Sequence, residues 1–281
     1  MSDFAIVTDS TAYIPQDLID KYHIHVAPQV LIWGEESYLD GVDIQPGEFY
    51  QRLEETDVYP TTSQATVVSF HTIFEPLVGQ QIPILAIVIS EKLSGTLQSA
   101  QQAKAMFPGA KIELVDSQST AMAMGFQVLA AARARERGAS FEKSLEIAKG
   151  AHNQTGVFFV VDTLEYLHRG GRIGGASKLF GTALNIKPLL QVTGGRVESF
   201  EKIRTKSKAI ERMLDVVEER LDGEDTIRIA ALHAAAESEA VRILEAAKKR
   251  LDPVEAMISV VSPVVGNHAG PGTVGLVYST V

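Results

Sequence analysis

PILAIVISEKLSGTLQSA, residues 83–100, decides the fold class. PILAIVI, residues 83–89, is a continuous apolar run, which is typical of a strand buried on both faces. A strand is therefore expected at 83–90, and a helix is predicted from Thr96 onward. Ser94 and Gly95 lie at the turn between them. Such a turn needs glycine and a helix start favours Ser or Thr, so these residues have a structural explanation. The functional alternative is that the small residues and free N–H groups at the turn hold an anion.

The rest of the first half repeats this pattern of apolar strand followed by helix, which predicts a mainly parallel sheet covered on both faces by helices. The strands are expected at residues 4–9, 24–33, 83–90 and 111–117. The second half differs, because Gly194-Gly195 between two β-prone runs predicts a hairpin over 188–203. Its other strands are expected at 156–162, 227–234, 256–266 and 273–281. We therefore expect an α/β protein of two domains, residues 1–155 and 156–281, the second with a mixed or antiparallel sheet and helices.

Composition excludes several function classes. The chain has 281 residues and a net charge of −9, and acidic chains bind nucleic acid or anionic membranes poorly, because both need a basic surface. There is no cysteine, which excludes disulfides and thiol chemistry and fits a reducing cytoplasm. The start, MSDFAIVTDS, has no basic region followed by an apolar one, and no apolar run reaches about 18 residues. We expect a cytoplasmic protein without stable membrane insertion.

Clusters of small polar residues lie at the ends of three predicted strands and before one helix. They are TDST (8–11), SEKLSGT (90–96), DSQST (116–120) and TTSQ (61–64). Each alone is explained as a helix cap or turn. Because ligands of open α/β sheets bind beyond the carboxyl ends of strands, the clusters together predict a polar, uncharged mouth suited to a carboxylate or phosphate. Neither GxxxxGK[ST] nor a GxGxxG after the first strand is present, so no nucleotide cofactor is expected.

Two glycine-rich stretches carry the remaining candidates. GNHAGPGTVG (266–275) predicts a bent loop with His268 at its tip, which is either an exposed or structural histidine or a hydrogen-bond donor to a carboxylate. HRGGRIGG (168–175) predicts an exposed loop, either a mobile linker or a contact for an anionic partner. Ser94 and His268 with an aspartate would make a hydrolase triad, but GxSxG is absent. No HxxxH or HExxH occurs, and no metal site is expected.

These motifs occur in a specific order over nearly the whole chain. It runs TDST, TTSQ, SEKLSGTLQSA, VDSQST, DTLEYLHRGGRIGG, IKPLL and GNHAGPGTVG. In this order the sequence resembles the DegV family, the bacterial fatty-acid-binding proteins. The resemblance implies a non-enzymatic lipid-binding subunit that holds a long-chain fatty acid between or beneath two α/β domains. A separate kinase subunit, related to dihydroxyacetone kinases, would phosphorylate the bound carboxylate to an acyl phosphate.

The resemblance also implies roles for individual residues. Thr62 and Ser94 would hydrogen-bond the carboxylate with His268 close by, Arg204 would support the carboxylate or the transferred phosphate, and Arg172 would help to dock the kinase subunit. The full expected carboxylate-binding set is Thr62, Ser63, Ser94, Gly95, Thr96, His268 and Arg204. The sequence departs from the family pattern at Ala65, usually Pro, and Ala123, commonly Gly, both expected beside the pocket.

Two other functions remain open on the sequence alone. One is an acyl hydrolase that uses Ser94 and His268, and the other is a lipid sensor or storage protein with no kinase partner. An apolar acyl chain of about 14 methylenes would contribute on the order of 10 kcal/mol on burial before ordering costs. The head group would then mainly orient the ligand.

Overall fold

The computed structural model describes residues 4–180 and 186–281. The predicted parallel sheet is confirmed in the N-terminal part, in the order β2-β1-β6-β7 with every pair parallel. Its strands are β1 Ala5–Asp9, β2 Ile24–Ala27, β6 Ile84–Val88 and β7 Ile112–Asp116. Each side chain of β6 is buried, as its continuous apolar run predicts.

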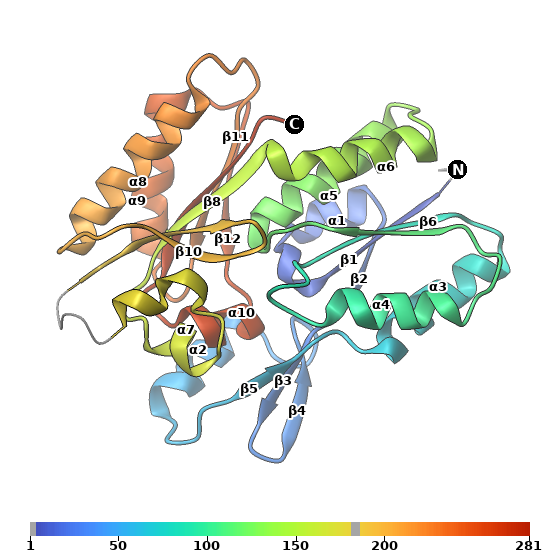
Figure 1. Cartoon of the computed structure of the whole chain (residues 1–281), viewed down its shortest axis with the longest axis horizontal. Helices are drawn as coiled ribbons and strands as arrows, with labels where there is room; N and C mark the ends of the chain where they lie inside the picture. Colours follow the sequence, from blue (N-terminus) through green and yellow to red (C-terminus); the bar gives the residue numbers. More distant parts are fainter. Residues whose placement is uncertain (1–3, 181–185) are drawn as a thin grey trace.

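Helices cover both faces of this sheet (Figure 1). On one face, α3 (Val67–Gly79) and α4 (Thr96–Ala105) share a hydrophobic cluster with β1 and β6, which includes Phe70, Leu97 and Val88. The other face meets α5 (Ala121–Glu136), and α6 (Phe141–Gly150) follows with Ser140 as its predicted cap. Short helical segments are η1 Ser10–Ala12, α1 Gln16–Lys21 and η2 Ala151–Asn153.

A small antiparallel sheet, β4-β3-β5, projects from this part of the molecule. It consists of β3 Val30–Trp33, β4 Glu36–Leu39 and β5 Thr61–Ser63, with α2 Pro46–Glu55 between the last two strands. The single strand predicted over 24–33 is wrong: the chain leaves one sheet at Ala27 and enters another at Val30. Pro28 lies at the break, since proline cannot donate to a strand ladder. The TTSQ segment, expected only as a polar cluster before a helix, begins as an edge strand that pairs with β3.

The C-terminal sheet has the order β10-β9-β8-β13-β11-β12, in which only β11 and β12 pair in parallel. This confirms the mixed sheet. Its strands are β8 Thr155–Val160, β9 Leu189–Thr193, β10 Arg196–Glu201, β11 Arg228–His233, β12 Glu255–Val260 and β13 Val274–Ser279. Helices α8 (Lys206–Leu221) and α9 (Glu237–Leu251) cover one face. The predicted hairpin turn is present, with φ of 55° at Gly194 and 82° at Gly195.

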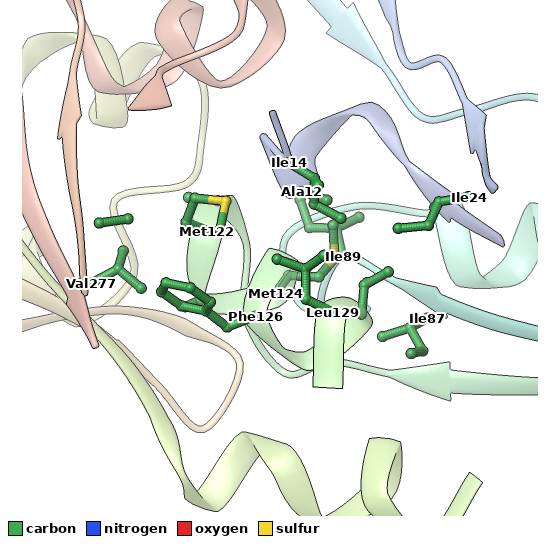
Figure 2. Close-up of a cluster of buried hydrophobic side chains, with 14 of the residues drawn as sticks. Ala12, Ile14, Ile24, Ile87, Ile89, Met122, Met124, Phe126, Leu129 and Val277 are labelled. Carbon is green, nitrogen blue, oxygen red and sulfur yellow. The ribbon is translucent and has the colours of Figure 1, made fainter. Parts of the chain in front are cut away.

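Helix α5 lies between the two sheets and has no polar face, in keeping with its sequence AMAMGFQVLAAA. Figure 2 shows Met122 and Phe126 on the side of Val277 of β13, and Met124 on the side of Ile89 beyond β6. One hydrophobic cluster therefore joins residues from both sides of position 155. The domain division at that position stays a prediction.

The segment after β12 differs from expectation. Residues 256–266 were predicted as one strand, but the strand ends at Val260, and α10 (Pro263–Ala269) follows with Pro263 at its first position. His268 therefore lies on a helix rather than at a loop tip. The glycine-rich stretch 168–175 is not one continuous loop either. It begins in the last turn of α7 (Glu165–Arg169) and ends in the 3₁₀ helix η3 (Gly174–Leu179). Within residues 4–180 and 186–281, no helix is long and apolar enough to cross a membrane.

Candidate functional site

A cavity of about 900 Å³, measured with the open space at its mouth, lies between the ends of the parallel strands, β5, α10 and one face of the C-terminal sheet. Most of its wall is aliphatic or aromatic. These lining residues are Ile89, Leu93, Ala121, Val157, Phe159, Leu167, Val192, Val197, Leu232, Val261, Val264, Val265 and Ala269.

The polar part of the lining consists mainly of hydroxyl and amide side chains. It comprises Thr11, Tyr13, Gln29, Thr62, Ser63, Gln64, Ser94, Thr120, Arg172, His268 and Thr273. No aspartate or glutamate belongs to the described lining, and Arg172 is the one arginine or lysine in it. An apolar space with hydroxyl donors, one guanidinium and no carboxylate suits an amphipathic anion.

Ser94 takes its place from the turn between β6 and α4, and it is not the helix cap. The cap position of α4 is Gly95, and no side chain caps the helix there. The hydroxyl of Ser94 instead lies 2.9 Å from Oγ1 of Thr96, while the residue lines the cavity. The explanation of Ser94 as a capping residue is therefore wrong.

A buried hydrogen-bonded group stands behind Ser94. The side-chain Nε2 of Gln29 donates to Thr96 Oγ1 at 2.9 Å and to Asp9 Oδ1 at 3.2 Å. Asp9 also accepts from the backbone of Ile89 at 2.8 Å, and from the backbone and hydroxyl of Thr11 at 3.0 and 2.6 Å. Burial raises the pKa of Asp9, and these donors oppose the rise. The group joins β1, the start of β3 and the start of α4 into one rigid support.

Thr62 and His268, which are 206 residues apart in the sequence, meet at the cavity. Oγ1 of Thr62 on β5 lies 2.7 Å from Nε2 of His268 on α10. Burial, and then the nearby Arg172 charge, lower the pKa of His268 to about 4, so its ring is neutral at physiological pH. Gly170 packs so closely on this ring that an added Cβ would overlap Nδ1.

The tautomer of His268 follows from burial. Its Nδ1 is buried and has no hydrogen-bond partner among the described residues. A proton on Nδ1 would be a buried N–H without an acceptor, which is rarer and costlier than an unused acceptor. The proton therefore lies on Nε2 and is donated to Thr62. Oγ1 of Thr62 accepts it, and the Thr62 hydroxyl proton is directed to the cavity.

Asp40 anchors the helix that carries His268. Its carboxylate accepts from the hydroxyls of Ser10 at 2.6 Å and Ser262 at 2.9 Å, and from the backbone N–H of Val264 at 3.3 Å. A carboxylate at a helix start is stabilised by the free N–H groups there. Burial nevertheless raises the pKa of Asp40 to about 6.

The hairpin β9–β10 contributes Val192 and Val197 to the lining, and its turn is tied to the loop that carries Ser94. Ser90 Oγ donates to the carbonyl of Gly195 at 2.7 Å, and Lys92 Nζ donates to the carbonyl of Gly194 at 2.7 Å. The two halves of the chain thus close the cavity together.

Arg172 does not lie on an exposed flexible loop, and that expectation is wrong. Its Nε donates to the carbonyl of Leu93 at 3.1 Å and its Nη1 to that of Gly170 at 2.7 Å, so the guanidinium is partly buried and lines the cavity. A role in docking a partner stays a prediction. Arg204, expected at the carboxylate, is exposed and is not among the lining residues.

The other expected residues divide into three groups. Ser63 lines the cavity, whereas Gly95 and Thr96 lie behind Ser94 and do not line it. Ala65 and Ala123 are fully buried and are not in the lining, but each lies within two residues of a lining residue, Gln64 and Ala121 respectively. Gln29 was missed, because nothing in a lone glutamine after Pro28 indicates a contact 67 residues away.

No hydrolase triad is assembled in the described part of the chain. His268 hydrogen-bonds Thr62, and no hydrogen bond joins it to Ser94, Asp9 or Asp116. Within residues 4–180 and 186–281 there is also no group of three or more His, Asp or Glu side chains placed to hold a metal ion.

Comparison with known proteins gives matches over almost the entire chain. The family described as "Uncharacterised protein, DegV family" matches residues 3–281. A DegV domain-containing protein from Clostridium perfringens is 38% identical over 278 residues, which cover 98% of both chains. A DegV family protein from Thermus thermophilus, whose structure is described for its fatty acid binding, is 35% identical with a TM-score of 0.93 over 99% of both chains. DegV of Bacillus subtilis, described as a fatty acid binding protein, is 32% identical with a TM-score of 0.90 over 99% of both chains. The chain belongs to the DegV family.

Proposed function

We propose that this protein binds a long-chain fatty acid, with the acyl chain in the apolar cavity and the carboxylate at Ser94 and Thr62. The observation that carries the proposal is the lining itself: an apolar wall, the hydroxyl groups of Ser94 and Thr62 and the Arg172 guanidinium, with no carboxylate among the described lining residues. The fatty acid binding described for the similar proteins from Thermus thermophilus and Bacillus subtilis supports it.

The two parts of the ligand would contribute differently. Burial of about 14 methylenes supplies on the order of 10 kcal/mol before the costs of ordering the chain. A hydrogen bond to the carboxylate supplies about 1.5–3 kcal/mol when the charge assists it. Affinity therefore depends on the tail, while the choice of an acid rather than an uncharged head depends on Ser94, Thr62 and Arg172.

We further propose that the protein is not an enzyme by itself but presents the carboxylate to a separate kinase subunit, related to dihydroxyacetone kinases, which forms an acyl phosphate. Two hydroxyl donors orient the carboxylate but leave it lone pairs for attack on a phosphoryl group. The neutral state of His268 keeps a second cation away from that nucleophile. Arg204, exposed just before α8, would meet the kinase or the transferred phosphate rather than the buried head.

The binding step is tested by extracting the purified protein under denaturing conditions and identifying the released lipid by mass spectrometry, followed by titration of the delipidated protein with palmitate and oleate. We expect one fatty acid per chain and weaker binding by Ser94→Ala at unchanged fold. Absence of both bound lipid and uptake would reject the function. The kinase step is tested by incubating the loaded protein with such a kinase and ATP and trapping the acyl phosphate with hydroxylamine; a loaded protein that yields none would be a sensor or store.

A further inference from the structure

We propose that the buried chain of hydrogen bonds from Asp9 through Gln29 and Thr96 fixes the hydroxyl of Ser94 as a donor toward the cavity, and so makes the site prefer an ionised carboxylate to an uncharged head of similar size. The inference rests on the proposed function and assigns positioning roles to Asp9 and Thr96, which do not line the cavity, and to Gln29, which does.

The chain starts at Asp9, which is completely buried at the end of β1. Two of its donors are backbone N–H groups, of Thr11 and Ile89, and these can only donate. The Asp9 carboxylate is thus the fixed acceptor end of the chain, and every neighbour that reaches it must present a hydrogen.

Gln29 is the next member, and its orientation follows from Asp9. If the amide were reversed, its carbonyl oxygen would face the carboxylate, which has no hydrogen to share. Nε2 therefore faces Asp9, and its two hydrogens go to Asp9 Oδ1 and Thr96 Oγ1. Gln29 is only 2% exposed, and Asp9 and Thr96 satisfy both of these hydrogens.

Thr96 passes this direction to Ser94. Its side chain is completely buried and already accepts from Gln29, so its own hydroxyl proton needs an acceptor. Among the described residues, the available acceptor is Oγ of Ser94, which lies 2.9 Å from Thr96 Oγ1. With Thr96 as donor, Ser94 accepts from behind and its remaining hydrogen is directed to the cavity that it lines.

From Gln29 onward, the N–H donated to Thr96, the Thr96 O–H and the Ser94 O–H all point toward the cavity, where their positive ends stabilise negative charge. Hydrogen bonds to an ionised acceptor are roughly twice as strong as those between neutral groups, and bonds in a chain strengthen one another. An acid therefore benefits more from the chain than an alcohol of the same length, which buries the same tail. The preference for acid over alcohol measures this effect separately from tail burial.

The test compares palmitate with hexadecanol, each displacing a fluorescent fatty acid from the delipidated protein. In Thr96→Val, which keeps the shape but removes the hydroxyl, we expect palmitate affinity and the palmitate-over-hexadecanol ratio to fall together. The upper bound is the effect of Ser94→Ala, roughly ten- to hundredfold for a lost charge-assisted hydrogen bond. Thr96→Ser should restore the ratio, because it keeps the hydroxyl.

Thr8→Val is a matched control, since Thr8 is also completely buried, its hydroxyl has no partner among the described residues, and it does not line the cavity. It should leave the ratio unchanged. If Thr96→Val does not fold, Gln29→Met takes its place in the test, because it interrupts the hydrogen-bond chain one step earlier. Equal loss for acid and alcohol, or no loss, would mean that Thr96 and Gln29 only support packing. A parent protein that binds neither ligand would instead reject the proposed function itself.

Discussion

Replacing His268 by glutamine is expected to change how stability depends on pH. The folded-state pKa of His268 is about 4, against an ordinary value of 6.5, because its ring is buried and faces Arg172. Between these values an unfolded chain takes up a proton at His268 and the folded protein does not. The contribution of His268 to the unfolding free energy therefore falls as the pH decreases from about 6.5 to about 4, by up to about 3 kcal/mol.

His268→Gln keeps a side chain that reaches Thr62 but does not titrate. Relative to the parent, this variant should gain up to about 3 kcal/mol over the same window, whatever its stability at neutral pH. Asp40 titrates with the opposite sign: its raised pKa of about 6 stabilises the fold at low pH, and that contribution is lost as the pH rises through 6. The difference between the two proteins cancels Asp40, because both retain it.

The assay is urea unfolding of delipidated protein at half-unit steps from pH 4 to pH 7.5, since a bound carboxylate would favour the protonated ring. His23→Asn is the control, because His23 is exposed and away from the cavity lining. A difference between parent and His268→Gln that stays constant within about 0.5 kcal/mol across the window would show that the ring is not held neutral by burial, and would remove the basis for the Nε2–H tautomer and for Thr62 as a donor.

Three further results are expected. Arg172→Gln should weaken fatty-acid binding about tenfold or more in titration calorimetry, because the lining loses its guanidinium. Arg204→Ala should change the affinity by no more than about twofold. The reverse ranking would mean that Arg204 contacts the head group. Val157→Phe should fill part of the cavity and exclude about two to three methylenes of the ligand. Affinity for the longest acids should fall roughly thirtyfold, and affinity for shorter acids should be unchanged. Equal losses of affinity at every chain length would contradict a tail at this position. Lys92→Ala should remove one tie between the Ser94 loop and the hairpin and speed lipid release in stopped-flow exchange, and an unchanged rate would show that the tie does not limit exit.

Local sequence patterns predicted most of the helices and strands, whereas features that depend on contacts between distant residues could not be predicted. The apolar run 83–90 and the Gly194-Gly195 turn depend on nearby residues, so the parallel sheet and the hairpin followed from sequence. The break at Pro28 and the helix that starts at Pro263 were missed, because an apolar run outweighed the proline in each prediction. Prolines carried the stronger signal there.

The candidate site shows the same limit. Ser94, Thr62 and His268 were predicted as neighbours through the family resemblance, and the structure brings all three to one cavity. The places of Arg172 and Arg204 were not predictable, because both lie in polar, glycine- or lysine-rich surroundings and only the folded backbone decides which one faces inward.

Helix α5 has a consequence for how the chain must be made and handled. Because its opposite sides pack on the two sheets, a fragment that ends near residue 155 would expose Met122 and Phe126 to water. Such a fragment is expected to aggregate rather than fold, and the intact chain to unfold in one cooperative transition instead of two. During synthesis the N-terminal half would therefore remain incompletely covered until β13 has been made and can pack on α5.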